Sequence, residues 1–144
     1  MIKAKIVNRI NFPKITLQDD LEFAARDIII PDIVRGIDNG LAINGGRLPA
    51  NDPQTIKRKG DNRPLIDTGE LRSSFYHARS GKSKVIISIR SGRKAIGGYL
   101  QNDGVTTKSG KKFYRFFGIS KDAHAAIMEY MDKRLKAITN DRHK

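Results

Sequence analysis

The last part of the chain carries one long amphipathic helix pattern, which constrains the fold more than any other feature of the sequence. Ser120 is a suitable N-cap, and Asp122 falls in the first turn, where the helix dipole favours a negative charge. Apolar residues then recur at helical spacing at Ala123, Ile127, Met131, Leu135 and Ile138. Such a stripe needs a second layer to cover it. The sequence therefore predicts a packed C-terminal helix, followed by a disordered tail at residues 140–144.

A second apolar pattern near the N-terminus predicts a helix that bends. The helix is expected to begin at a Thr16 cap and to continue to the Asn-Gly stop at residues 39–40. Pro31 has no backbone N–H, so the helix must kink or restart there. The predicted buried face consists of Leu17, Leu21, Ala24 and Ile28, and the acids predicted to face water are Asp19, Asp20, Glu22 and Asp27.

Between these helices the sequence favours strands and turns. Residues 40–64 are rich in Gly, Pro, Asn and Asp, which predicts a long connection with at most one helical turn at residues 52–55. Residues 74–78 and 84–90 are expected to pair as a hairpin, and residues 105–107 and 112–117 as a second one. The predicted fold class is α+β, in which an N-terminal bent helix and a C-terminal helix pack with a small antiparallel sheet containing hairpins. Residues 1–139 are expected to form a single domain with a long loop at 40–64.

One short motif follows the long connection. The segment Leu65-Ile66-Asp67-Thr68-Gly69 places an apolar pair directly before a helix-start signal. Asp67 and Glu70 have the spacing of a capping box in acidic form, although Thr68 can serve as the cap instead. Capping explains this pair of carboxylates better than acid–base chemistry does. The motif is therefore expected to stabilise the fold.

The motif has two companions, at residues 48–60 and at residues 115–123. In this order and at these separations, the three segments resemble the phage virion morphogenesis proteins, also called tail-completion proteins, typified by a late protein of Mu-like phages. The resemblance covers most of the chain from about residue 17 to residue 138. The positions that match the family motif are Leu65, Ile66, Asp67, Thr68, Gly69, Leu71, Phe116 and Gly118. The chain departs from the family at Arg47, Asp103 and Phe116, where an aromatic, an aromatic and a proline are common, which leaves the details of subunit contacts open.

The resemblance implies a role rather than a chemistry. It implies a structural assembly protein of a tailed phage or prophage, which acts as a ring component in tail completion or head-tail joining. The implied partners are further copies of the chain and other tail or neck proteins. The implied places of action are the cytoplasm of the bacterial host during assembly and then the virion.

The charge of the chain is concentrated in one segment. The net charge is +13, and residues 71–121 hold twelve basic groups against one acidic group. A field of that density attracts polyanions or an acidic protein face, although a solvated surface would carry it equally well. The candidate contact residues for a partner or for nucleic acid are Arg79, Lys82, Arg90, Arg93, Lys94, Lys108, Lys111, Lys112 and Arg115. A basic nucleic-acid-binding module is therefore the alternative function, whereas in a ring the acids at 19, 20 and 22 of a neighbour would face this segment.

No catalytic, cofactor or metal site is predicted. The chain has no cysteine, which excludes thiol nucleophiles and cysteine-ligated metals, and its three histidines lack ligand-type residues at helical spacing. The Gly81-Lys82-Ser83 triplet lacks the upstream glycine of a phosphate-binding loop. No apolar run is long enough to cross a membrane. The aromatic residues Phe113, Tyr114, Phe116 and Phe117 are predicted to be core or subunit contacts, with base stacking as the alternative.

Overall fold

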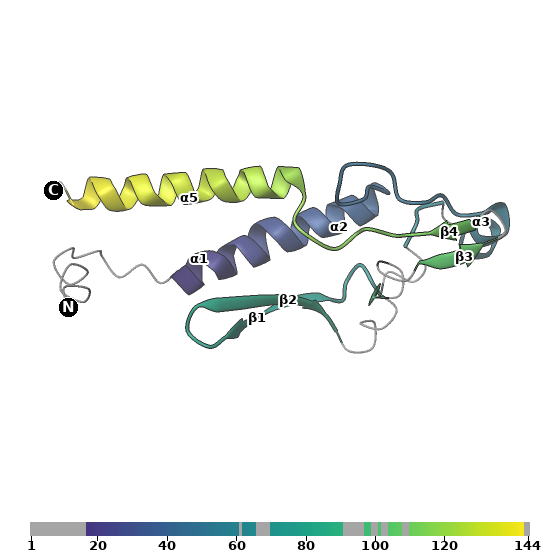
Figure 1. The fold of residues 1–144 in the computed structure, drawn as a ribbon, viewed down its shortest axis with the longest axis horizontal. Coiled ribbons are helices and arrows are strands. Elements are labelled where there is room, and N and C mark those ends of the chain that lie inside the picture. The colour runs from purple at the N-terminus through teal and green to yellow at the C-terminus, as the bar shows by residue number, and fades with distance from the viewer. Residues whose placement is uncertain are drawn as a thin grey trace, which may run out of the picture.

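The computed structural model describes residues 17–60, 62–65, 70–90, 97–98, 101, 104–107 and 110–142. The elements in chain order are α1 (Leu17–Phe23), the π-helix η2 (Ala24–Ile29), α2 (Ile30–Asp38), α3 (Pro53–Lys59), β1 (Phe75–Ser80), β2 (Lys84–Ile89), β3 (Val105–Thr107), β4 (Gly110–Lys112) and α5 (Lys121–Arg142). The rod formed by α1, η2 and α2 lies between α5 on one side and the β1–β2 hairpin on the other, while α3 and the β3–β4 hairpin lie together at the far end (Figure 1). The predicted α+β class is confirmed.

The N-terminal rod changes its helix type just before Pro31. The backbone N–H of Ile30 donates to the carbonyl of Ala25, five residues back, and Pro31 falls in the first turn of α2. A proline in that turn removes no hydrogen bond that the new helix needs, and a π-helical turn is one of the usual ways to interrupt an α-helix. The prediction that the helix kinks or restarts at Pro31 is thus correct. The π-helix η2 is what interrupts the α-helix there. The predicted Thr16 cap lies outside the described residues.

The buried face of this rod differs from the predicted one at its start. Leu17 is 48% exposed, whereas Gln18 and Asp20 are buried. The Gln18 amide donates to the carbonyl oxygens of Gly81 (3.1 Å) and Lys84 (3.0 Å), so it closes the β1–β2 turn. The periodicity failed here because two polar side chains have long-range partners, which hydrophobicity alone does not reveal.

The core lies where the rod meets the hairpin. Ile29, Ile33 and Ile37 form an i, i+4 row that packs with Leu71, Phe75, Ile89 and Phe116. β1 and β2 are antiparallel, with Phe75 opposite Ile89 and Ser80 opposite Lys84. Along β2, Ile89 is buried whereas Ile86 is exposed. Ile33 and Ile37 are the largest fully buried side chains among the described residues.

The second hairpin is shorter than predicted. β3 pairs with β4 from Val105 opposite Lys112 to Thr107 opposite Gly110, and the predicted strand at residues 112–117 is wrong. The chain instead runs on past α2, where the N–H of Ile43 donates to the carbonyl of Arg115 (2.7 Å). Phe116 enters the core there, with its ring centroid 6.1 Å from that of Phe75. Of the four aromatics predicted to be core or subunit contacts, Phe116 is a core residue, and Tyr114 and Phe117 are partly buried against the core.

The 40–64 connection contains a helix that the sequence reading underestimated. Asp52 accepts a hydrogen bond from the N–H of Thr55 (2.8 Å), Pro53 occupies the first turn, and Gly60 ends α3 with φ of 71°. Asp52 is thus the N-cap, Pro53 is a favoured residue of the first turn, and Gly60 is the left-handed residue that ends the helix. Leu48 is also buried, which attaches the connection to the rest of the molecule. The expectation of at most one turn is therefore wrong.

α5 joins the rod through a buried carboxylate. The Tyr130 hydroxyl donates to Asp20 Oδ1 (2.6 Å), as does Arg134 Nε (3.2 Å), and Asp20 is 3% exposed. The Tyr130 ring also stacks on Phe23 at 4.3 Å between centroids. The prediction that Asp20 faces water is wrong, because α5 covers it. The helix continues to Arg142, so residues 140–142 are not the disordered tail that was expected.

We predict that Tyr130→Phe lowers the free energy of unfolding by about 1.5 to 3 kcal/mol, because it removes a hydrogen bond to a buried carboxylate. Urea denaturation measures this value. Tyr76→Phe is the matched control, since Tyr76 lies exposed on β1 and its change should stay within about 0.5 kcal/mol. Equal effects of the two substitutions would show that the Asp20 contact does not stabilise the fold.

Candidate interaction surfaces

The first predicted contact residue, Arg79, is already paired within the chain. Its Nε contacts Glu22 and its Nη2 contacts Asp19 (2.5 Å). These hydrogen bonds raise the pKa of the Arg79 guanidinium above its ordinary value. The structure thus corrects the expectation that Arg79 serves a partner and that Asp19 and Glu22 are free to face a neighbour. Both acids belong to a link between α1 and β1.

The remaining predicted cations divide into two groups. Lys82, in the β1–β2 turn, and Arg90, just after β2, are exposed. Lys111, Lys112 and Arg115 lie in and just after β4. The predicted contacts Arg93, Lys94 and Lys108 lie outside the described residues.

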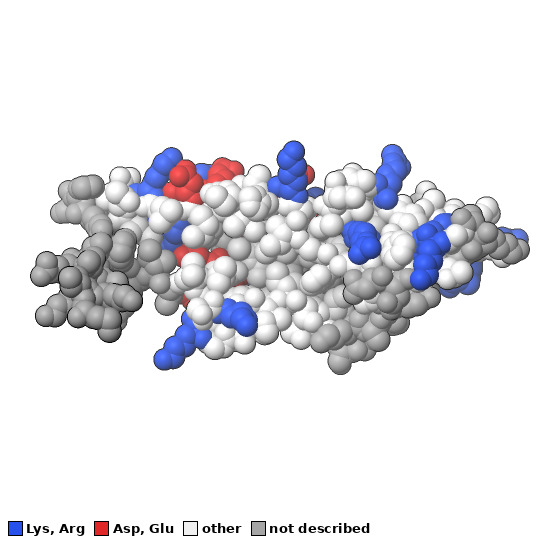
Figure 2. Space-filling model, viewed as in Figure 1, with Lys and Arg blue, Asp and Glu red and all other residues white. Residues whose placement is uncertain are grey.

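A set of cations that we call the basic arm forms one end of the molecule. α3 and the β3–β4 hairpin both lie at that end, where basic side chains stand out on the surface (Figures 1 and 2). The arm consists of Arg47, Lys57, Arg58, Lys59, Lys111, Lys112 and Arg115. The Lys112 ammonium donates to the carbonyl of Ala50 (3.1 Å), which ties β4 to the segment before α3. Sequence reasoning missed the three α3 cations, although the Asp52 cap and the Gly60 stop mark that helix.

The charge of the basic arm is one-sided. The described acidic residue within it is Asp52, whose carboxylate caps α3 and has a lowered pKa because it accepts a hydrogen bond from the Thr55 backbone. The arm also exposes apolar side chains at Ile56 and Phe113, and the Arg115 guanidinium lies 5.1 Å from the Phe113 ring centroid. This end of the molecule can therefore offer cations together with an apolar surface.

The opposite end holds a hollow of about 440 Å³ between α1, β1 and α5. We call it the carboxylate pocket, and the residues that define it are Asp19, Asp20, Glu22, Arg79, Tyr130 and Arg134. Asp20 Oδ2 is buried and has no hydrogen-bond partner in the part of the chain that the structure describes. A buried carboxylate oxygen without a partner is unusual and needs an explanation.

α5 carries an apolar stripe beside this pocket. Met128 and Leu135 are 57% and 53% exposed, and Met131 and Ile138 are partly buried. The helix spans 22 residues, about 33 Å, and its last turns extend beyond the start of α1 (Figure 1). The predicted packed stripe is thus confirmed at Ala123 and wrong at Leu135, since the rod ends before it covers the whole helix.

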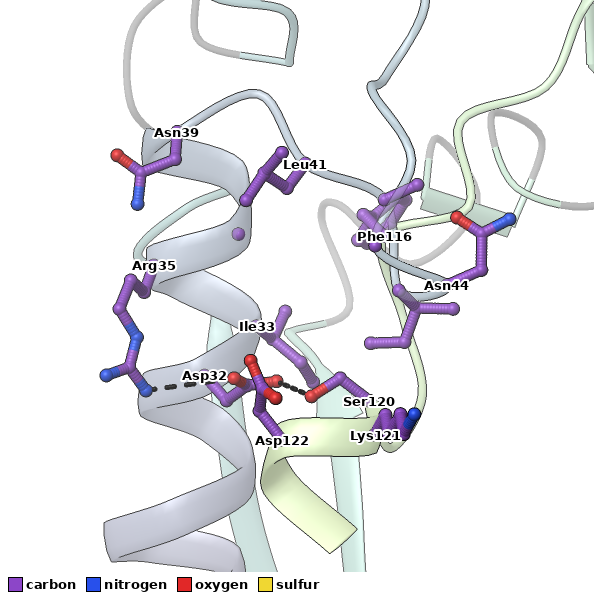
Figure 3. Close-up of a pocket in the computed structure, with 14 residues that line it drawn as sticks. Asp32, Ile33, Arg35, Asn39, Leu41, Asn44, Phe116, Ser120, Lys121 and Asp122 are labelled. Carbon is purple, nitrogen blue, oxygen red and sulfur yellow. Dashed lines mark hydrogen bonds and ion pairs between the residues drawn. The ribbon is translucent and has the colours of Figure 1, made fainter. Parts of the chain in front are cut away.

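A second hollow, of about 290 Å³, lies where α2 meets the start of α5. Asp32 and Ser120 point toward each other across it (Figure 3), and Ser120 Oγ donates to Asp32 Oδ2 (2.6 Å). The same Ser120 oxygen accepts from the N–H of Ala123 (3.0 Å), so the predicted cap is confirmed. Ser120 therefore both starts α5 and fixes that start against α2.

The family-motif positions are only partly visible. Ile66, Asp67, Thr68 and Gly69 lie outside the described residues, so the capping box stays a prediction. Leu71 and Phe116 are core residues, and Leu65 packs against the core with φ of 63°, which is unusual for a leucine. Arg72, which follows Leu71, pairs with Asp38 at the end of α2. The distance from Arg72 Nη2 to Asp38 Oδ2 is 2.7 Å. The segment around the motif is therefore attached to the core on both sides of the gap.

The described residues contain no group of three His, Cys, Asp or Glu side chains placed to hold a metal ion. Within the same residues, no helix has the length and apolar character needed to cross a membrane. Comparisons with protein-family models, curated proteins and solved structures gave no match.

We predict that Ser120→Ala destabilises the protein by about 1 to 3 kcal/mol, because it removes the cap of α5 and the hydrogen bond to Asp32 together. Asp32→Asn keeps the cap and should cost less. Ser83→Ala, in the exposed β1–β2 turn, is the matched control. Thermal melting of the three variants gives their order of stability. A Ser120→Ala protein as stable as the Ser83→Ala control would show that the Ser120 contacts do not stabilise the start of α5.

Proposed function

We propose that this chain is a structural assembly protein that forms a closed ring of identical subunits, in tail completion or head-tail joining of a tailed phage or prophage. The observation that carries the proposal is the pair of unlike surfaces at opposite ends of an elongated subunit. One end has the basic arm, and the other has the carboxylate pocket with the apolar stripe of α5. The resemblance of residues 48–60, 64–75 and 115–123 to tail-completion proteins supplies the place in the particle.

Unlike surfaces favour a ring over a two-fold dimer. A two-fold contact uses the same patch on both subunits, whereas a contact between different patches repeats by rotation and closes when the angle permits. An exposed apolar stripe also suits a subunit contact, since Met128 and Leu135 remain open to water in the single chain. The other tail or neck proteins would then bind to the outer faces of this ring.

The basic arm also supports a second candidate, a nucleic-acid-binding module. The arm has seven basic residues and one described acidic residue, Asp52, and this excess of positive charge suits binding of phosphate groups. Phe113 also presents an exposed ring beside Arg115, on which a base could stack. Within a ring the two functions are compatible, because copies of the arm would form one repeated basic rim. Binding of DNA should then fall steeply as salt rises, through counterion release.

We predict that native mass spectrometry of the purified chain shows one dominant oligomer that grows with protein concentration. Leu135→Glu should shift the population toward monomer, because it puts a charge on the apolar stripe. Ala125→Glu is the matched control, since Ala125 is exposed on α5 outside the stripe. A strict monomer at high concentration, or equal loss of assembly in both variants, would contradict the ring. Strong salt-sensitive DNA binding by such a monomer would favour the second candidate.

A further inference from the structure

Two leucines at the start of α1 are left uncovered. Leu17 and Leu21 are 48% and 37% exposed, and they form one apolar row because they lie four residues apart. Successive helical residues are about 100° apart, so this row lies nearly opposite Asp19 on the helix. Asp19 contacts Arg79 of β1. The leucine row is therefore on the far side of α1 from the link to β1.

β2 has an open edge beside this row. Within the described residues β2 pairs with one strand, β1, which the contact of Arg79 with Asp19 holds toward the other side of α1. β2 is therefore the strand nearer to Leu17 and Leu21. An open edge presents backbone N–H and C=O groups that another strand can pair with. A strand added there would also place one row of its side chains over the two leucines.

The first residues of the chain have the sequence of such a strand. Every second residue of the segment 2–12 is apolar, with Asn8 as the exception, and the positions between them include Lys3, Lys5 and Arg9. Alternation of this kind, rich in isoleucine, is typical of a strand with one buried face. Lysine on the outward face is also a common feature of strands that end a sheet.

The point where this segment joins α1 sets its direction. Gln18 bonds to Gly81 and Lys84, so α1 begins at the turn of the β1–β2 hairpin. A strand at residues 2–12 must run toward that turn, which makes it antiparallel to β2 and parallel to β1. Antiparallel pairing is slightly the more stable of the two. The four residues 13–16 reach up to about 14 Å. That length exceeds the spacing of neighbouring strands, about 4.8 Å, and of packed layers, about 10 Å.

We propose that residues 2–12 add to the open edge of β2 in the same chain as a third, antiparallel strand, whose apolar face covers Leu17 and Leu21. The strand order of the sheet is then 2–12, β2, β1. The short connection favours the chain's own β2 over that of another copy, because it keeps the segment at a high effective concentration. This inference does not rest on the proposed assembly function, since it uses none of the α5 stripe.

Disulfide trapping tests this placement, because the chain has no cysteine of its own. Ser88 lies between two β2 residues that pack in or against the core, so its side chain is on the outer face of the sheet. Ser88→Cys combined in turn with Val7→Cys, Arg9→Cys or Asn11→Cys should give an intramolecular disulfide in the pair that the register places opposite. Ser88→Cys with Asn8→Cys should not, because Asn8 belongs to the inner face.

Tyr76→Cys is the matched control for the choice of edge. Tyr76 lies directly opposite Ser88 on β1, one strand further from the open edge of β2, so its pairing with Arg9→Cys should fail. Preferred coupling to position 76 would move the segment to the edge of β1. Equal coupling at residues 8 and 9 would show that the segment does not dock, and disulfides between chains would assign it to another copy. Each of these three results would overturn the inference.

Hydrogen exchange of the full chain gives a second readout. Ile6→Asp with Ile10→Asp puts charges on the face that covers the leucines, so the β2 amides that do not bond to β1 should exchange about tenfold faster. Lys5→Asp with Arg9→Asp puts the same side chains on the outward face and should leave the protection of these amides unchanged. Exchange of β2 that is the same in the parent and in the Ile6→Asp, Ile10→Asp protein would contradict the added strand.

Discussion

The buried carboxylate of Asp20 is the contact on which the arrangement of the two long helices depends. It accepts hydrogen bonds from Tyr130 and Arg134, so it holds the middle of α5 against α1. The last turns of α5 extend beyond the start of α1. At the start of α5, Ser120 and Asp32 make a second polar joint to α2. Between these joints only Ala123 is buried and Ile127 partly buried on α5. The helix is therefore held by directional polar contacts more than by a wide apolar face.

The sequence predicted most of the elements but not the way in which they pack. The Ser120 cap marked the start of α5 correctly and the Asn39-Gly40 stop marked the end of the rod, because caps and stops are local interactions that the sequence records within a few positions. The buried positions of Gln18 and Asp20 were missed, since their partners lie 63 to 114 residues away. The C-terminal end of the α5 stripe was wrongly assigned to the core, because periodicity shows which side of a helix is apolar but not what covers it.

The sequence also predicted the candidate surfaces only in part. A charge density of +11 in residues 71–121 indicated a basic surface, and Lys111, Lys112 and Arg115 do lie on the basic arm. Arg79 is instead bound to Asp19 and Glu22, which no linear pattern could reveal. The α3 cations joined the arm only through folding, because Lys112 of β4 binds the carbonyl of Ala50 in the segment before α3. Charge summed along a chain thus locates a surface less well than charge summed over neighbouring elements.

The central claim is that unlike ends of identical subunits meet head to tail, and a mixing experiment tests it most directly. One variant has a reversed arm (Lys57→Glu with Lys111→Glu), and the other has a charge placed on the apolar stripe of α5 (Leu135→Glu). Each alone should be monomeric, because every copy lacks one half of the contact. Mixed in equal amounts, they should form a dimer of one copy each and nothing larger, as measured by native mass spectrometry. Failure of the mixture to associate, or full-size oligomers from either variant alone, would contradict the account.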